Sequence, residues 1–271
     1  MNMKITFLGS GGAFTDFREN YHNNALVETS EGPVLIDCGG TAVQSMKELT
    51  VPVWDLVGVF ITHLHGDHMG GLEQLLWERY YTGPLGGPGF MSTPVYAAPV
   101  IHAGLRRSLH ECVDEYCDHN GMNKKGGYYV LVDTCKVAPQ SFPIEIGDTL
   151  FQLIPTPHVE GDGVSKAAFG VLIGKPCGDK AVWAYWTGDT LFRPDLMEIA
   201  PLAQVIFHDC TFSPYYDGTV HTHYSQLLTL PDEVRARIIL MHHTQVPDDI
   251  DVVADGFQGA ADRHSVYTFE P

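Results

Sequence analysis

The feature that most constrains this chain is the histidine-rich segment ITHLHGDH at positions 61–68, which directly follows an apolar run. Because strand residues alternate between two faces, His63 and His65 can project to the same side of a strand end. The glycine that follows lets the backbone turn and bring Asp67 and His68 round as a second group. Four such side chains exceed what one tetrahedral zinc ion usually takes from so short a segment. The segment therefore predicts a site for two neighbouring divalent metal ions.

A polar loop that happens to be rich in histidine is the alternative interpretation of this segment. Four titratable side chains converging on one strand end would be costly unless something neutralised them, which favours a metal site. The segment resembles the HxHxDH motif of the metallo-β-lactamase superfamily. That resemblance implies an αββα sandwich, in which two facing sheets carry helices on their outer sides. Periodicity alone predicts only a mixed α/β (α+β) fold.

Three later positions can complete the metal site, because each lies at or just past the end of a predicted strand. They are His158 in LIPTPHV, Asp189 in VWAYWTGDT and His242 in RIILMHHT. By resemblance, one metal ion has three histidine ligands, the second has an aspartate and two histidines, and one aspartate bridges the two ions. In that order the ligands are His63, His65 and His158; Asp67, His68 and His242; and Asp189.

Two features of this ligand set stay open. Adjacent strand residues face opposite ways, so only one of His242 and His243 readily joins the site, and the two assignments can be exchanged. Aligned to the LTHxS pattern of ribonuclease Z-like proteins, LMHHT places His242 at the ligand position. Imidazole and carboxylate ligands without a thiolate suit zinc, and manganese or iron are also admissible. We therefore expect two divalent ions, with Zn²⁺ as the default and Mn²⁺ or Fe²⁺ as alternatives.

Two further segments indicate the reaction. HDCTF at positions 208–212 resembles the HEATF segment of ribonuclease Z-like hydrolases, with Asp209 in place of glutamate, and VHTHYSQ resembles their GHSTxxQ segment. A carboxylate that orients an imidazole forms a general-acid pair, here Asp209 and His221, which can protonate the leaving alkoxide of a phosphodiester. His223 is the rival for the histidine role, because it can share a strand face with His221. Asp67 is counted among the catalytic residues and is expected to stay ionised beside the metal ions.

The periodicity of apolar residues predicts the elements that carry these motifs. The expected helices span residues 41–49, 69–81 and 100–117. The expected strands span residues 4–8, 25–29, 33–37, 56–62, 95–98, 128–132, 142–146, 150–155, 167–173, 181–185, 205–208, 237–241 and 265–269. Asp37, at the end of one of these strands, has two equally weighted interpretations, which are indirect contact with the metal loop and capping of the following glycine turn.

Length and the lack of visible repeats favour one domain over residues 1–271, with an insertion at about 83–136. The inserted helix carries an apolar stripe that the domain body or another subunit has to cover, so we expect a cap over the active site or a dimer contact. Scattered cysteines, no secretory signal pattern and no long apolar run predict a soluble cytoplasmic protein that does not bind membranes.

The formal charge of −17 bears on the substrate. Affinity for nucleic acid rests heavily on lysine and arginine contacts to phosphates, so an acidic chain disfavours large nucleic acid as a partner. The whole chain is similar to ribonuclease Z-like cyclic nucleotide phosphodiesterases, including those of the anti-Pycsar type that degrade cyclic pyrimidine signals. This resemblance is carried by the metal motifs and by the segments GGLEQLLWERYY and VHTHYSQLLTLP.

That resemblance implies an enzyme, a metal-dependent phosphodiesterase that acts on a small phosphodiester, foremost 3′,5′-cyclic nucleotides. The attacking group is expected to be a hydroxide held between the two metal ions, with a histidine as general acid, and the protein is expected to be a homodimer. A transfer-RNA 3′ processing endonuclease (ribonuclease Z) is the first alternative, although the long arm typical of that group is not visible. A lactonase or other acyl-hydrolase, or a metal-bound module without catalysis, is the second.

Overall fold

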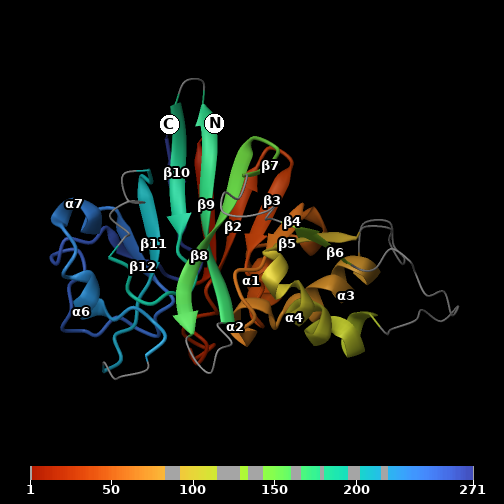
Figure 1. The fold of residues 1–271 in the computed structure, drawn as a ribbon, viewed down its shortest axis with the longest axis horizontal. Helices are drawn as coiled ribbons and strands as arrows, with labels where there is room; N and C mark the ends of the chain where they lie inside the picture. Colours follow the sequence, from red (N-terminus) through yellow and green to blue (C-terminus); the bar gives the residue numbers. More distant parts are fainter. Residues whose placement is uncertain are drawn as a thin grey trace, which may run out of the picture.

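The computed structural model describes residues 2–82, 92–114, 129–133, 143–159, 166–177, 180–194, 202–214 and 219–270. Over these ranges the chain forms two seven-stranded sheets that stand side by side in the middle of the molecule (Figure 1). In spatial order, the first sheet contains β14 (Val266–Phe269), β1 (Met3–Gly9), β2 (Asn24–Thr29), β3 (Gly32–Ile36), β4 (Gly58–Phe60), β5 (Thr93–Ala97) and β6 (Tyr129–Asp133). The second contains β13 (Gly259–Ala260), β12 (Ile238–Met241), β11 (Val205–Asp209), β10 (Lys180–Trp186), β9 (Lys166–Cys177), β8 (Thr149–Val159) and β7 (Ile144–Ile146).

Side chains along a strand point alternately to the two faces of the sheet, and this produces two hydrophobic cores. In β10, Val182, Ala184 and Trp186 lie in the larger core together with residues of the first sheet, whereas Tyr185 lies in a smaller core on the other face. The rings of Phe7 in β1 and Trp186 are 5.2 Å apart at their centroids, so aromatic packing joins the two sheets. Burying each ring of this kind stabilises the fold by about 1.5–3 kcal/mol.

Helices cover the outer faces of both sheets, which completes the αββα sandwich (Figure 1). The first sheet is accompanied by α1 (Ala42–Glu48), the 3₁₀ turn η1 (Val53–Asp55), α2 (Gly66–Met69), α3 (Leu72–Thr82), α4 (Pro99–Leu109) and the π-helical turn η2 (His110–Asp114). The second is accompanied by α6 (Tyr224–Leu227) and α7 (Asp232–Arg235). The expected mixed fold of two facing sheets with outer helices is confirmed. Every helix in the described ranges is too short or too polar to span a membrane.

Parallel pairing sets the position of the functional site. Strands β3 to β6 pair in parallel in the first sheet, and β10 to β13 do so in the second. The carboxyl ends of parallel strands meet at one edge, where loops can carry reactive groups. The histidine-rich segment follows β4, and residues 187–190 follow β10. Asp209 ends β11 and His242 follows β12, so these groups come from the same edge of the sandwich.

The predicted insertion at about 83–136 is partly integral to the first sheet, because β5 and β6 lie within it and extend the parallel pairing from β4. Its predicted helix at residues 100–117 is α4 followed by η2 as far as Asp114, and residues 115–117 lie outside the described residues. The apolar stripe of Ile101, Leu105, Leu109 and Val113 is buried in the larger core. The body of the domain therefore covers that stripe. Three expectations stay predictions: that this region forms a cap or a dimer contact, that residues 1–271 form one domain, and that the protein is a homodimer.

Candidate metal centre

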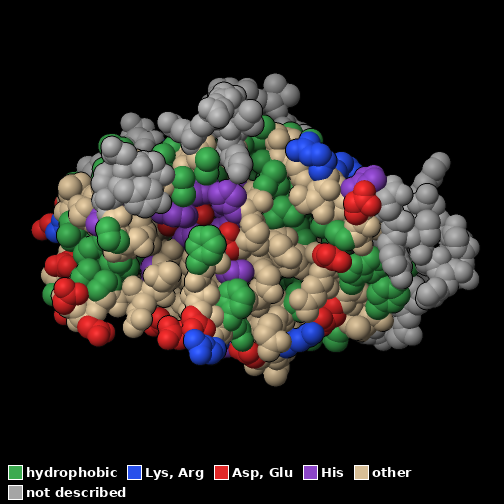
Figure 2. Space-filling model, turned by 90° about the horizontal axis from the view of Figure 1, so that it is seen from below, with side chains coloured by type: hydrophobic (Ala, Val, Ile, Leu, Met, Phe, Trp, Pro, Cys, Tyr) green, Lys and Arg blue, Asp and Glu red, His purple; other side chains and the backbone are tan. Residues whose placement is uncertain are grey.

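The segment at 61–68 delivers its side chains through a short strand and a single helical turn. β4 ends at Phe60, earlier than expected, and an irregular segment leads to His65, which has extended dihedral angles and directly precedes α2. Asp67 and His68 lie within α2 and therefore leave the backbone in a different direction from His63 and His65. Of these four side chains, those of His63, Asp67 and His68 are buried. Figure 2 shows histidine side chains gathered with acidic ones in a hollow on one face of the molecule.

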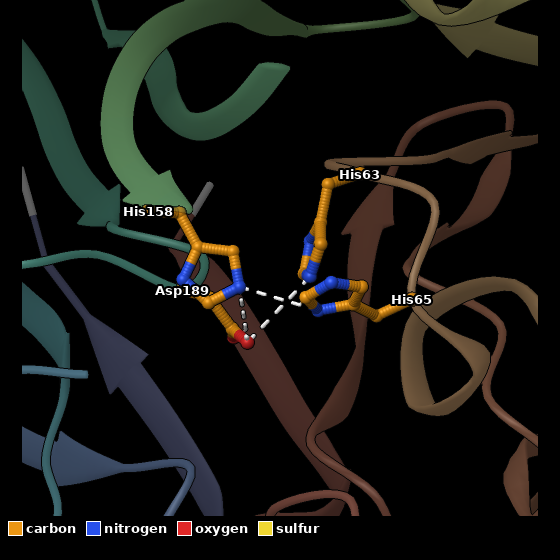
Figure 3. Close-up of side chains that lie close together, drawn as sticks. All are labelled: His63, His65, His158 and Asp189. Atoms are coloured by element: carbon orange, nitrogen blue, oxygen red, sulfur yellow. Dashed lines mark hydrogen bonds and ion pairs between the residues drawn. The ribbon is translucent and has the colours of Figure 1, made fainter. Parts of the chain in front are cut away.

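A first group of donor atoms is formed by His63, His65, His158 and Asp189 (Figure 3). The distance from His65 Nδ1 to His158 Nε2 is 3.2 Å. Asp189 Oδ2 lies 3.6 Å from His63 Nε2 and 3.6 Å from His158 Nε2. His158, in the last residues of β8, is oriented by its other ring nitrogen, which is 2.8 Å from the carbonyl oxygen of Val220.

A second group is formed by Asp67, His68, Asp189 and His242. Asp67 Oδ2 lies 3.3 Å from His68 Nε2 and 3.1 Å from His242 Nε2. Asp189 Oδ1 lies 3.2 Å from His68 Nε2 and 3.4 Å from His242 Nε2. One oxygen of Asp189 thus faces the first group and the other faces the second, which is the arrangement that a bridging carboxylate requires.

The donor atoms fit a pair of divalent cations. Zinc bonds of about 2.0–2.2 Å in tetrahedral directions place neighbouring ligand atoms roughly 3.4 Å apart. The contacts between donor atoms given above run from 3.1 to 3.6 Å, and all donor atoms of a group lie within 4.8 Å of one another. The buried atoms His63 Nε2, His68 Nε2 and Asp189 Oδ1 have no hydrogen-bond partner among the residues that the structure describes. Buried polar atoms without partners are costly, and a cation between them would satisfy all three.

Carboxylates shape the proton affinities of this cluster. Burial of the His242 ring lowers its pKa, but the neighbouring carboxylates of Asp189, Asp209 and Asp67 outweigh burial and raise that pKa to about 10. Burial raises the pKa of Asp67, but the hydrogen bond from His242 and the adjacent ring of His68 outweigh it and hold that pKa well below its usual range. The cluster without metal therefore keeps anionic carboxylates against a protonated imidazole, and a cation would compete with that proton.

His242, and not its neighbour His243, joins the second group. In β12, Met241 lies in the larger core and Leu240 in the smaller one, so plain alternation would send His242 to the outer face. The backbone of His242 has a φ of 59°, which breaks the alternation and turns its ring into the site. His243 is buried 6.0 Å from the ring of Phe212, and burial lowers its pKa to about 4.

Asp37 contacts the histidine-rich segment behind the donor atoms, which agrees with the first of the two interpretations of this residue. Its Oδ2 is 2.8 Å from His68 Nδ1, and its Oδ1 accepts a hydrogen bond of 2.8 Å from the backbone N–H of Thr62. Asp37 also has a left-handed backbone, with a φ of 59°. A carboxylate behind a histidine fixes the ring and its tautomer, leaving Nε2 as the donor atom. The sequence signal for this role was a carboxylate at a strand end, which alone does not distinguish it from a turn cap.

Asp209 serves two histidines at once. Its Oδ2 accepts a 2.9 Å hydrogen bond from His221 Nδ1, and its Oδ1 lies 3.4 Å from His242 Nδ1. The backbone N–H of Thr190 also donates to Oδ2, at 2.9 Å. His221 is adjacent to both donor groups, since its ring centroid lies 5.3 Å from that of His158 and 4.8 Å from that of His242. The second contact, to His242, was not predicted from the sequence.

His223, the rival of His221, lies at the start of α6. Its Nδ1 accepts a hydrogen bond from the backbone N–H of Ser225, and its own N–H donates 2.9 Å to the side chain of Gln226. This reciprocal pair is a capping box, which satisfies backbone groups at the helix start. The geometry therefore gives His223 a capping contact, while His221 faces the donor groups.

The sequence comparison decides the family. The family described as "Anti-Pycsar protein Apyc1" matches residues 3–267 of the chain. The chain belongs to the Anti-Pycsar protein Apyc1 family. The expected resemblance is thereby confirmed, and so is the expectation that the protein is an enzyme, a metal-dependent hydrolase.

Two members of the Apyc1 family and one solved structure illustrate the relationship. Anti-Pycsar protein Apyc1 of Paenibacillus sp. (strain J14) is 29% identical over 280 residues, which cover 99% of this chain and 100% of that protein. The protein of the same name from Bacillus phage 010DV004 is 30% identical over 252 residues, or 91% of each chain. The metallo-β-lactamase fold protein YhfI from Bacillus subtilis shares the fold, with a TM-score of 0.71 at 18% identity over 99% of this chain and 100% of its own.

Proposed function

We propose that this protein is a phosphodiesterase that hydrolyses 3′,5′-cyclic nucleotides with two divalent metal ions, of which zinc is the metal that best suits the donor set. Membership in the Anti-Pycsar protein Apyc1 family and the resemblance to cyclic nucleotide phosphodiesterases support the substrate class. The observation that carries the proposal is the pair of Asp209 and His221, which stands against both groups of donor atoms. The charge of −17 also favours a small substrate over a long nucleic acid.

The residues proposed to hold the metals are the two donor groups, with Asp189 shared between them. When bound, a pair of divalent cations polarises a phosphoryl oxygen and lowers the pKa of water, so that attack on phosphorus proceeds at neutral pH. The chain itself contributes orientation: Asp37 holds His68, the carbonyl of Val220 holds His158, and Asp209 faces His242. Groups fixed in advance need no reorganisation during the reaction.

The proposed general acid is His221. Burial lowers the pKa of its ring, but the Asp209 carboxylate outweighs burial and raises that pKa above its ordinary value. The raised pKa favours the protonated ring, in which Nδ1–H donates to Asp209 and Nε2–H is free to protonate the departing alkoxide of the phosphodiester. The side chain is 27% exposed, which allows a substrate to reach it.

The decisive experiment compares His221→Ala with His223→Ala in metal-loaded protein. We expect His221→Ala to lower kcat on cyclic nucleotides by about 10²–10⁴-fold, the usual contribution of a positioned acid, with the metal content unchanged. On a nitrophenyl phosphodiester, whose leaving group needs no proton, the same variant should lose far less. His223→Ala is the matched control, because its ring caps α6, and it should keep nearly full kcat.

A substrate panel tests the class of reaction. Wild-type protein with a full metal complement is assayed on cyclic mononucleotides, precursor transfer RNA and lactones. Turnover of the cyclic mononucleotides is the expected result. Cleavage of transfer RNA or a lactone with no turnover of any cyclic mononucleotide would contradict the proposal, as would equal losses in the two histidine variants.

A further inference from the structure

Phe14 stands out among the exposed apolar side chains, because it is 96% exposed on the loop that follows β1. A single exposed hydrophobic residue needs no functional explanation by itself. The position of Phe14 does call for an explanation, because its loop lies directly beside the proposed metal ligand His242. A Cβ atom added to Gly12 would lie 3.3 Å from Cε1 of that ring. Consecutive Cα atoms are about 3.8 Å apart, so the Cα atom of Phe14 lies within about 7.6 Å of the Cα atom of Gly12, the glycine beside His242.

The loop is fixed rather than loosely attached. Thr15 N donates 3.1 Å to the carbonyl of Gly12, which closes a turn with Phe14 at its third position. Gly11 is held between Tyr21 and Asn23 by two backbone hydrogen bonds of 2.8 Å each. A nearly fully exposed ring on so well-anchored a backbone is presented to solvent at a defined place.

His22 holds the same turn from beneath. Its side chain is buried, and its ring lies close to the carbonyl of Ala13, the residue before Phe14. The ring of the half-exposed Phe17 stands edge-on against His22, with centroids 4.9 Å apart. The turn that carries Phe14 is thus braced by a packed histidine and a second aromatic ring. Figure 2 shows hydrophobic side chains directly beside the hollow that holds the histidines.

We propose that Phe14 is the surface on which the base of the nucleotide substrate stacks, an inference that rests on the proposed function. A cyclic nucleotide has a charged end, which the metal centre would bind, and a flat aromatic base that extends away from it. Every base offers a π-face, so an aromatic side chain beside the centre binds bases with little sequence preference. Phe14 would then set affinity for the base, and it is not expected to take part in bond cleavage.

The test measures kcat and KM of wild type, Phe14→Ala, Phe14→Leu and Phe14→Tyr on a cyclic nucleotide and on the abasic ribose 3′,5′-cyclic phosphate. We expect Phe14→Ala to lower kcat/KM on the nucleotide by about 5- to 150-fold, the range for losing one stacked base, mostly through KM. The abasic compound should be cleaved equally by all four proteins. Phe14→Tyr should restore wild-type values, and Phe14→Leu, which keeps apolar bulk without a π-face, should not.

Binding provides a second readout. Nucleotide is titrated into metal-loaded His221→Ala protein and into the metal-loaded double variant His221→Ala, Phe14→Ala in a calorimeter. The double variant should show a loss of affinity similar to the loss in kcat/KM. Val253→Ala, which removes another exposed apolar side chain, 62% exposed, is the matched control and should change neither affinity nor turnover.

The outcomes separate the two proposals. If wild type cleaves cyclic nucleotides and Phe14→Ala or Phe14→Leu equals wild type, the stacking inference is overturned while the proposed function stands. An equal loss on the abasic compound would also overturn it, because the base would then be irrelevant. If wild type cleaves no cyclic nucleotide, the proposed function fails first and the inference fails with it.

Discussion

Asp37 illustrates how a residue without direct access to metal can control the site. It is fully buried, and its carboxylate joins His68 to the backbone of Thr62 at the start of the metal segment. We predict that Asp37→Ala lowers metal affinity by about 10–100-fold, as loss of a carboxylate behind a histidine ligand usually does. Metal content after dialysis against graded chelator concentrations measures this.

Asp37→Asn is the matched control for that variant, because the amide oxygen can still accept the hydrogen bond from His68 Nδ1, while the charge and the second acceptor oxygen are lost. Its affinity should lie between those of wild type and Asp37→Ala. Retention of full metal content by Asp37→Ala at every chelator concentration would show that Asp37 only caps the turn.

At the residue scale, the sequence predicted which side chains converge but not how each is held. The seven predicted ligands come together because strand ends meet at one edge, and strand ends are visible in the pattern of apolar residues. The choice between His242 and His243 depended on a positive φ, which a β-period cannot predict. The distinction between His221 and His223 depended on a helix of four residues, α6, too short to have a periodic signal.

At the element scale, the turn between β7 and β8 joins the two sheets at the end opposite the metal centre. Asp148 accepts hydrogen bonds from Lys175 Nζ in β9 and from the backbone N–H of Ser30 in the β2–β3 turn, each at 3.0 Å. Burial raises the pKa of Asp148, but these donors outweigh it and lower that pKa overall. A carboxyl group whose pKa is lower in the folded state than in the unfolded state stabilises the fold at pH values above its unfolded-state pKa. This contribution is lost as pH falls through its folded-state pKa.

We therefore predict that Asp148→Asn lowers the free energy of unfolding by about 1–2 kcal/mol at neutral pH, the scale of a charge-assisted hydrogen bond. As pH falls below the ordinary aspartate pKa of about 3.9 and then through the lower pKa of the folded state, the difference from wild type should shrink, because the wild-type carboxyl becomes protonated in the unfolded and finally in the folded state. Urea unfolding at pH 7 and in acid measures both values. A constant difference at all pH values would contradict the assignment to this charge.

The observed boundaries of helices and strands agree with the predicted ones where a periodic apolar pattern extends over the whole element. They differ where strand pairing or a turn determines the boundary. The predicted strand at 4–8 is β1, and the predicted helix at 41–49 is α1. The strand expected at 150–155 continues through two prolines to Val159, because antiparallel pairing with β9 extends that far. The two-residue β13 was not predicted, since a pairing so short has no sequence pattern.

At the scale of the whole molecule, the proposed metal site lies across the contact between the two sheets. The proposed ligands of the first sheet come from the segment after β4, and those of the second come from β8 and from the segments after β10 and β12. Burial without cations would leave carboxylates and imidazoles of both sheets competing for protons and hydrogen bonds. Periodicity alone did not predict this two-sheet arrangement, because it identifies strands but not which strands pair; the family resemblance supplied it.

Metal removal should therefore weaken the whole sandwich and not only abolish activity. A ligand that binds the folded state at 100 times its Kd stabilises that state by about 2.7 kcal/mol, which corresponds to a Tm change of roughly 5–10 °C for a chain of this size. We predict a fall of this order when a chelator is added to metal-loaded protein, measured by differential scanning calorimetry. Asp189→Ala, which removes the shared ligand, is the control and should show a much smaller fall. An unchanged Tm in chelated wild type, with the metal demonstrably gone, would mean that the two sheets are held by their apolar contacts alone.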